Sequence, residues 1–599
     1  MSADRVGDCG GGYNPAMTPP SRDPVPGGRD TTTSPEISTG YRDGMVEVVT
    51  DTFAVSTANQ HATDAAVGVL ADGGTALDAA VAAQFMLGLT EPQSSGIGGG
   101  CYLLHFDAAT GNTTAFDGRE TAPAAATGTY LTRISDDDPR PPVPDALRSG
   151  RSVGVPGAVA ALELAHRRFG RIAWADLIAP AIRCAEEGFS VSHRLWASID
   201  DAKTDLARCP EAARHFLDDA GEAKAEGTVL TNPDYARTCE LIAEHGADAL
   251  RTGEIAEAIV ERVCRPSDTV TPGLMTLADL AGYQAVECAP LWSTYRGLRL
   301  AGTPPSSSGG ITVAAILGML EHHDLGAPPR NGVPAPELVH LVSEVERLAY
   351  ADRDTFIADG YPLPDMLDRD YLRERAALID MDRTMGTAEP GLPTNGLAAG
   401  RDLPEYGTSQ VSVIDAAGNA VSLTTSIEIG FGSFHMVRGF LLNNTLTDFS
   451  AEPTDVHGRP VANRVESGKR PRSSMAPTLV FDGPDLRAVV GAPGGAVIIQ
   501  YVVKILVALI DWGLDAQQAV GAPNFGARNT RVTAVGGEHP LIGEAEDGPA
   551  RVLIDGLVSR GHRVQLADQP SGAAVLVVRP DGRISGGADP RREGTVGGI

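Results

Sequence analysis

An almost entirely apolar segment near the C-terminal end limits the possible folds of this chain most strongly. The segment AVIIQYVVKILVALIDWG, Ala496 to Gly513, is apolar on nearly all sides until its last turn, which is typical of a buried helix. A second segment, PELVHLVSEVERLAYADRDTFI, places Leu338, Leu341 and Val345 on one face and predicts an amphipathic helix. Alternating stretches such as GCYLLHF, QVSVID, AVSLTTSI and RAVVGA predict strands. Because helices and strands interleave without an internal repeat, the residues alone indicate an α/β or α+β protein.

The N-terminal part of the chain divides into a polar tail and a helical region. Residues 1–44 are rich in Gly, Pro, Ser, Thr and Asp, which predicts a disordered tail, with order beginning near Val46. The segment HATDAAVGVLADGGTALDAAVAAQFMLGL predicts two helices of small residues. They are interrupted at Gly73-Gly74, and Thr75 is the expected N-cap of the second helix.

The composition argues against several classes of function. The net charge of −28 argues against nucleic-acid binding, since no basic face is available to displace counterions. The 7 cysteines are scattered without a CxxC pair, which offers no metal cage and suits a reducing compartment. The N-terminal segment lacks the apolar run of a secretory signal, and no stretch approaches the ~20 apolar residues of a membrane span. We therefore expect a cytoplasmic protein without a membrane partner.

Several common catalytic motifs are missing from the sequence. GIGGGC, Gly96 to Cys101, lacks the final glycine of a dinucleotide-binding GxGxxG loop, and the chain contains neither a Walker A loop nor a GxSxG elbow. The pair His322 and His323 in EHHD does not have the HExxH spacing of a zinc site and is better explained by a helix end. The sequence therefore predicts neither a metal nor an organic cofactor.

One short stretch carries a candidate nucleophile. EYGTSQVSVIDAAGNAVSLTT, Glu405 to Thr425, reads as two strands joined by a tight turn, but a Gly-Thr pair stands at its start. The hydroxyl of Thr408 becomes nucleophilic if a base takes its proton, and its own α-amine is such a base once the 407–408 peptide bond is cut. Gly407 can adopt unusual backbone angles that leave its carbonyl open to attack, and the β-methyl of Thr408 restricts its χ1 angle. From this stretch alone, a self-cleaving nucleophile and an ordinary strand-edge threonine both remain open.

The wider sequence resembles the γ-glutamyltranspeptidase family of self-processing N-terminal nucleophile hydrolases. The resemblance runs from about Val46 to Pro590 and rests on eight motifs that stand in the family's order: TEPQSSGIGGGCYLLHF, AFDGRETAPA, TPPSSSGGITVAAIL, SEVERLAYADRDTF, GTSQVSVIDAAGNAVSLTTSIEIGFGS, GFLLNNTLTDFS, GKRPRSSMAPTLV and GAPGGAVII. It implies an α+β fold, a four-layer αββα sandwich built from both products of one precursor. The large subunit would comprise residues 45–407 and the small subunit residues 408–599, headed by Thr408, in one globular unit.

The resemblance also implies a binding site for a substrate carboxylate. Arg119 would hold the carboxylate, because a guanidinium matches it with two parallel hydrogen bonds. Ser473 and Ser474 would add hydroxyl donors. Gly494 and Gly495 precede the apolar helix, so their N–H groups would stabilise an oxyanion at its N-terminus.

The remaining implied roles concern the substrate ammonium and the nucleophile. Asp448 and Glu428 would hold an ammonium group, and Ser426 would orient Thr408. The sequence departs from the family in having Thr445 where Glu or Gln usually stands beside the ammonium, and in having Ser426 where Thr is common. The segment between Asp448 and Ser473 is also shorter than in members with a long lid, so a more open site is expected.

Taken together, these residues predict a hydrolase or acyltransferase that acts on a small molecule. Thr408 would form an acyl-enzyme with a γ-glutamyl-like amino acid substrate, and water or an amine would resolve it. The alternative is a family member recruited to intracellular antibiotic or alkylproline biosynthesis, where it hydrolyses a C–C bond of a different acid. A catalytically inactive scaffold is a third possibility, which the retained Thr408, Arg119 and glycine pair argue against. Assembly into a homo-oligomer is left open.

Overall fold

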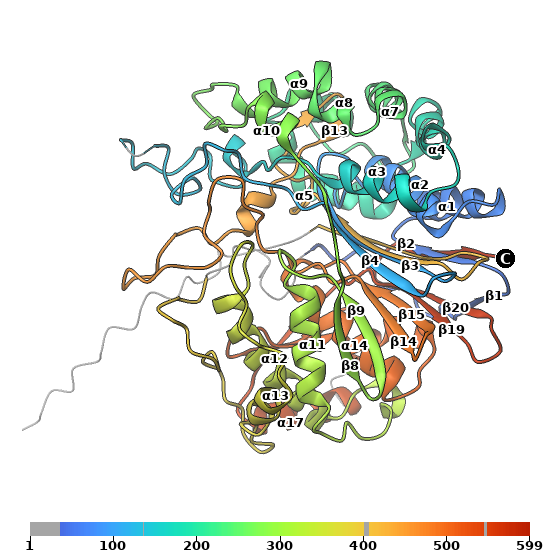
Figure 1. Ribbon diagram of the computed structural model, residues 1–599, viewed down its shortest axis with the longest axis vertical. Coiled ribbons are helices and arrows are strands. Elements are labelled where there is room, and N and C mark those ends of the chain that lie inside the picture. Colours follow the sequence, from blue (N-terminus) through green and yellow to red (C-terminus); the bar gives the residue numbers. More distant parts are fainter. Residues whose placement is uncertain (1–35, 136, 401–406, 544–547) are drawn as a thin grey trace, which may run out of the picture.

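Most strands of the protein lie in two seven-stranded antiparallel sheets (Figure 1). The computed structural model describes residues 36–135, 137–400, 407–543 and 548–599. The first sheet has the strand order β21 (Thr595–Gly598), β2 (Ala54–Thr57), β10 (Ser409–Ile414), β11 (Ala420–Ser426), β3 (Gly100–Asp107), β4 (Asn112–Asp117), β7 (Val286–Cys288). The second has the order β1 (Val48–Thr50), β20 (Ile584–Ala588), β19 (Ala574–Val578), β15 (Asp485–Gly491), β14 (Thr478–Asp482), β9 (Leu298–Gly302), β8 (Leu291–Tyr295).

The alternation of side chains along β10 shows how the two sheets face each other. Val411 and Val413 belong to the apolar cluster under the helices of the first sheet, whereas Ile414 belongs to a separate cluster between the sheets. Ser412 points to the second sheet, because its Oγ donates to the carbonyl oxygen of Ala574 at 2.9 Å. This is the two-residue period of a strand buried on both faces.

Helices cover the outer face of the first sheet. They are α1 (Gln60–Ala71), α2 (Ala76–Thr90), α3 (Ala158–Phe169), α4 (Trp174–Glu187), α5 (His193–Leu206), α6 (Pro210–Phe216), α7 (Pro233–His245), α8 (Asp248–Arg251), α9 (Gly253–Cys264) and α10 (Leu277–Gly282). All residues of α2 are buried, and Thr75 caps it through a reciprocal capping box with Asp78. The two predicted helices of small residues and the predicted cap are therefore confirmed.

A second group of helices covers the outer face of the second sheet. It contains α11 (Gly309–Leu320), α12 (Pro336–Phe356), α13 (Arg369–Ala376), α14 (Ile498–Ile510), α15 (Ala516–Gly521), α16 (Pro540–Gly543) and α17 (Pro549–Ser559). Helix α14 is buried until its last turn, as predicted. Helix α12 was predicted to be amphipathic, but it is buried on nearly all sides, and Arg347 and Arg353 are fully enclosed. Its polar face finds protein partners instead of water: Arg347, for example, pairs with Glu344 at 2.7 Å.

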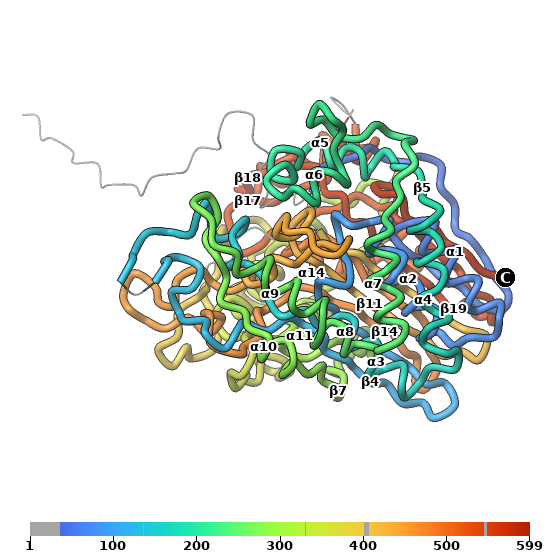
Figure 2. The backbone as a smooth tube through the Cα atoms, turned by 90° about the horizontal axis from the view of Figure 1, so that it is seen from above, coloured from blue at the N-terminus to red at the C-terminus, as the bar shows by residue number. Residues whose placement is uncertain are grey.

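The α+β class is confirmed, but the predicted boundary of the tail is wrong. Residues 1–35 lie outside the described residues, whereas residues 36–44, assigned to the tail, contact the body of the protein. Glu36 is buried, and the Tyr41 hydroxyl donates to the carbonyl oxygen of Gly521 at 2.9 Å. The N-terminal strand β1 pairs with β20, and the N–H groups of Asp51 and Thr52 just after β1 donate to the carbonyl oxygen of Ile599, so this blue segment lies beside the C-terminus (Figure 2). Among the described residues, no helix is both long and apolar enough to cross a membrane.

Candidate active site

Thr408 stands immediately before β10, at the start of the hairpin that the sequence predicts. The β10–β11 register pairs Ser409 with Thr425, which brings Ser426 beside Thr408. The Thr408 hydroxyl donates to Ser426 Oγ at 3.5 Å, and Ser426 Oγ donates to the carbonyl oxygen of Gly407 at 2.6 Å. The N–H of Glu428 donates to the same Ser426 oxygen at 2.8 Å. Ser426 therefore links the candidate nucleophile to the carbonyl group of the preceding residue.

The backbone at Gly407 explains why glycine occupies this position. Its φ angle is 33°, and a Cβ atom would lie 2.6 Å from the carbonyl oxygen of Glu428 and 3.1 Å from that of Gln93. Any larger residue would clash with these main-chain atoms. The enclosure holds the 407–408 peptide bond next to the hydroxyl of Thr408.

Several non-glycine residues in the loop after β11 have positive φ angles, which set the directions of their side chains. Glu428, Phe431 and Phe434 have φ angles of 82°, 66° and 63°. Such conformations cost roughly 1–3 kcal/mol each and persist where the surroundings impose them. Glu428 turns toward Asp448, so the two carboxyl groups lie close together.

Arg119 forms the centre of a buried charged cluster. Its guanidinium makes an ion pair with Asp448, approaches Glu120 at 3.5 Å and donates through Nε to the carbonyl oxygen of Pro471 at 3.3 Å. Burial alone would lower the pKa of Arg119, but Asp448 and Glu120 reverse this effect and raise it. Burial raises the pKa of Glu120 to about 7, against the opposing charge of Arg119, and burial likewise raises the pKa of Asp448.

Ser473 and Ser474 lie close to this cluster, because Pro471, a hydrogen-bond partner of Arg119, precedes them by two and three residues. Both serines are buried. Arg353 donates to Ser474 Oγ at 2.7 Å, which occupies an acceptor site of this hydroxyl and leaves its proton free to point elsewhere. Ser473 Oγ accepts from the N–H of Met475 at 3.2 Å in the same way.

Gly494 and Gly495 lie between β15 and the buried helix α14. Their φ angles are 134° and 58°, both in the region that favours glycine. The strand before them reaches the nucleophile's strand, because a Cβ at Gly491 would lie 2.2 Å from the side chain of Gln410. Gly494 and Gly495 therefore lie shortly after the end of β15, and this end packs against β10.

Thr445 lies inside the charged cluster, but its hydroxyl already has a partner. The hydroxyl donates to Asn443 Oδ1 at 2.8 Å. The Thr445 side chain also lies beside the carboxyl group of Glu120. Thr445 thus contacts an acid that sequence reasoning missed, although Glu120 follows Arg119 directly in the motif GRETAPA.

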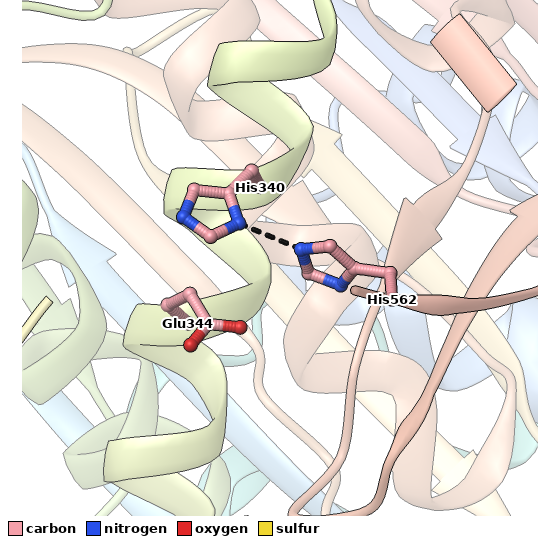
Figure 3. A group of neighbouring side chains, drawn as sticks. All are labelled: His340, Glu344 and His562. Carbon is pink, nitrogen blue, oxygen red and sulfur yellow. Dashed lines mark hydrogen bonds between the residues drawn. The ribbon is translucent and has the colours of Figure 1, made fainter. Parts of the chain in front are cut away.

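A different group of buried side chains has the donor types of a metal site (Figure 3). His340, Glu344 and His562 come together from α12 and the turn after α17. His340 Nδ1 and His562 Nε2 lie 2.6 Å apart in a direct hydrogen bond, and Glu344 Oε1 accepts from Arg347 and from Thr384. A metal ion would have to break these bonds, so the arrangement is that of a satisfied polar cluster. The predicted non-ligands His322 and His323 lie just after α11 and are not part of it.

Known proteins resemble this chain over nearly its whole length. The family model described as Gamma-glutamyltranspeptidase matches residues 62–599. The Glutathione hydrolase proenzyme of Bacillus subtilis (strain 168) is 35% identical over 564 residues, which cover 91% of this chain and 91% of that protein. The chain belongs to the gamma-glutamyltranspeptidase family. The resemblance inferred from the sequence motifs is confirmed, and the protein is an enzyme of this family of transferases and hydrolases.

Relatives with other names are similar over even more of the chain. The Acylase ACY 1 proenzyme of Pseudomonas sp. (strain SE83) is 33% identical over 584 residues, covering 96% of each chain. The crystal structure of cephalosporin acylase from Bacillus halodurans matches with a TM-score of 0.78 at 25% identity and covers 98% of this chain and 99% of that one. Relatives named for glutathione hydrolysis and for acylase activity are thus both similar to this chain.

Proposed function

We propose that the protein is an autoprocessed N-terminal threonine hydrolase or acyltransferase that works through an acyl-enzyme. The observation that carries the proposal is the hydrogen-bonded chain from the Thr408 hydroxyl through Ser426 to the Gly407 carbonyl. Cleavage at this bond divides the protein into subunits ending at 407 and starting at 408, which stay together in one four-layer αββα sandwich. The proenzyme names of the relatives support a single processed precursor.

Self-cleavage uses the groups around the 407–408 bond. Thr408 Oγ attacks the carbonyl carbon of Gly407, Ser426 polarises the carbonyl oxygen by donating to it, and the C–N bond breaks as the nitrogen takes a proton. The resulting ester is hydrolysed by water. The products are the Gly407 carboxylate and a Thr408 with both its hydroxyl and a free α-amine.

In turnover, the free α-amine acts as the base for the hydroxyl of its own residue. The hydroxyl oxygen of Thr408 attacks the substrate carbonyl, and the N–H groups of Gly494 and Gly495 stabilise the oxyanion. The leaving amine departs with a proton and the acyl group stays on Thr408. Water then completes hydrolysis, or an amine completes transfer.

The charged cluster supplies the recognition of an amino acid substrate. Arg119, assisted by Ser473 and Ser474, binds the carboxylate, and Asp448 and Glu428 bind the ammonium. Within the described part of the chain, Asp448 Oδ1 is buried and has no hydrogen-bond partner. A buried acceptor of this kind favours a ligand that donates.

A second candidate substrate is an acid other than a γ-glutamyl amide, as in antibiotic or alkylproline biosynthesis with cleavage of a C–C bond. Thr445 favours it, because its hydroxyl is shorter than the usual Glu or Gln and is engaged with Asn443. The acylase names among the relatives also favour a wider range of acyl groups.

A substrate screen separates the two candidates. Purified protein is incubated with γ-glutamyl amides and, in parallel, with N-acyl amides and alkyl-substituted acids, and the products are identified by mass spectrometry. Thr408→Ala protein is the control for background hydrolysis. Turnover of none of the sets by a cleaved wild-type protein would contradict the proposed activity.

A further inference from the structure

A buried carboxylate from the N-terminal segment lies between two buried arginines. Glu36 Oε2 pairs with Arg194 at 2.5 Å, and Glu36 Oε1 pairs with Arg592 at 2.5 Å. Both guanidiniums are 1% exposed. The three residues come from the segment before β1, from α5 and from the segment before β21, so the carboxylate joins distant parts of the chain.

This cluster reaches the main chain of the candidate nucleophile. Arg592 Nη1 donates to the carbonyl oxygen of Thr408 at 3.1 Å, while its Nε donates to the carbonyl oxygen of Pro570 at 2.9 Å. Arg592 thus fixes the main chain of Thr408 through its carbonyl oxygen, and Glu36 fixes the position of the Arg592 guanidinium.

The negative charge of Glu36 offsets part of the positive charge of Arg194 and Arg592. Burial alone would raise the pKa of Glu36, but Arg592 and Arg194 outweigh it and lower the pKa. The neighbouring Glu91, 3.5 Å from Arg194 Nε, has its pKa raised by burial to about 7. Near neutral pH, Glu91 therefore carries only part of a negative charge. Glu593 also acts on Arg194 and Asp589 on Arg592, but Glu36 is the carboxylate that pairs with both guanidiniums among the described residues.

The same segment also borders the bond that would be cut. A cavity of about 370 Å³ is lined by Glu36, Ile37 and Arg194 on one side and by Gly407 and Ile429 on another. The N-terminal segment therefore contributes a wall of the cavity that Gly407 also lines.

From these contacts we infer that Glu36 is a positioning residue for the nucleophile: it holds Arg592 on the Thr408 carbonyl and limits the positive charge around Thr408. The inference rests on the proposed function, since it assigns Glu36 to the same reaction.

Two consequences follow if the Glu36 charge is removed. Arg592 and Arg194 repel each other without their shared anion, so the hydrogen bond to the Thr408 carbonyl weakens and self-cleavage slows. The excess positive charge also disfavours the protonated form of the nearby α-amine, so the amine pKa falls. The acid limb of the kcat/KM profile then moves to lower pH.

The experiment compares Glu36→Gln with the matched control Glu47→Gln. Glu47 also belongs to the N-terminal segment and pairs with Arg579 at 3.0 Å, immediately before the outer strand β1 and away from Thr408. For folded precursor isolated by gel filtration, we expect Glu36→Gln to cleave at least about tenfold more slowly, as for a lost hydrogen bond to a charged group. We expect its acid limb to shift to lower pH, and both properties of Glu47→Gln to match the wild type.

Two further variants separate position from charge. Glu36→Asp keeps the charge but shortens the side chain, so cleavage should slow while the acid limb stays in place. The double variant Glu36→Gln with Arg194→Gln removes one anion and one cation, and should move the acid limb back toward the wild type. These variants also serve if Glu36→Gln does not yield folded protein.

Failure of the inference differs from failure of the proposed function. A wild-type protein that never cleaves would contradict the proposed function. A wild-type protein that cleaves, together with Glu36→Gln that cleaves at the same rate and has the same acid limb, would overturn only the role of Glu36.

Discussion

Replacement of Arg119 separates substrate binding from self-cleavage. The guanidinium is fully buried and pairs with Asp448 and Glu120, so Arg119→Ala would leave two carboxyl groups buried without their cation. Breaking a buried ion pair in this way costs about 3–5 kcal/mol of folding free energy. Arg119→Lys keeps the positive charge but loses the planar fork that a carboxylate needs. The lysine variant therefore isolates the effect on binding from the loss of stability.

The expected loss for Arg119→Lys is large in turnover and small in cleavage. Losing a charge-assisted bidentate pair costs about 2–4 kcal/mol, which is about a 30- to 1,000-fold decrease in kcat/KM. Self-cleavage should proceed near the wild-type rate, because Arg119 does not contact the Gly407 carbonyl in the described hydrogen bonds.

The assay combines denaturing electrophoresis of the precursor with steady-state kinetics on a chromogenic γ-glutamyl anilide or on the acyl substrate that the screen identifies. Arg470→Gln is the matched control, since this arginine pairs with Asp117 at 3.4 Å and not with Asp448. Wild-type kcat/KM in Arg119→Lys would refute the assignment of the carboxylate site.

Three further predictions concern other positions. Gly407→Ala should slow self-cleavage at least about tenfold in a time course, because its Cβ would lie 2.6 Å from a carbonyl oxygen. The control Gly430→Ala, whose Cβ would have its nearest neighbour at 4.0 Å, should cleave at the wild-type rate. Equal cleavage rates of the two variants would contradict the steric argument. Thr445→Gln should raise kcat/KM for γ-glutamyl amides about tenfold by adding an acceptor for the ammonium, and should lower turnover of the alternative acid, as measured by parallel kinetics; no change in either would mean that this position does not select the substrate. Burial, with Arg347 and His340, lowers the pKa of His562 to about 3, below the ordinary 6.5. The unfolded chain therefore binds a proton that the folded protein does not, so stability should fall as pH decreases from 6.5 toward 3, by up to about 1.4 kcal/mol per pH unit. Denaturant titrations of His562→Asn should show a shallower decrease over this range, and an unchanged slope would contradict the prediction.

The local features of the site were predictable from the sequence because local chemistry determines them. The Gly-Thr pair before two alternating stretches places Thr408 at the start of a hairpin, and the apolar run around Ile498 to Ile510 requires a buried helix. The resemblance to the family additionally implied Arg119, Asp448, Ser473 and Ser474 as substrate-binding residues.

Contacts between distant residues could not be predicted in this way. Glu36 lies in a segment whose composition indicates disorder, and its partners Arg194 and Arg592 are 158 and 556 residues away in the chain. Helix α12 shows the same limit, since its polar face resembles a solvated surface until the tertiary structure supplies partners for Arg347. A single sequence contains no signal for such pairings.

The most direct test of this account is the N-terminal sequence of the protein after purification and incubation. Intact-mass spectrometry and Edman sequencing should find a second chain that begins at Thr408 and contains 192 residues, 599 minus 407. Thr408→Ala should remain one chain and show no turnover. A wild-type protein that is active as a single uncut chain, or that is cut elsewhere, would contradict the claim that Thr408 acts through its own free amine.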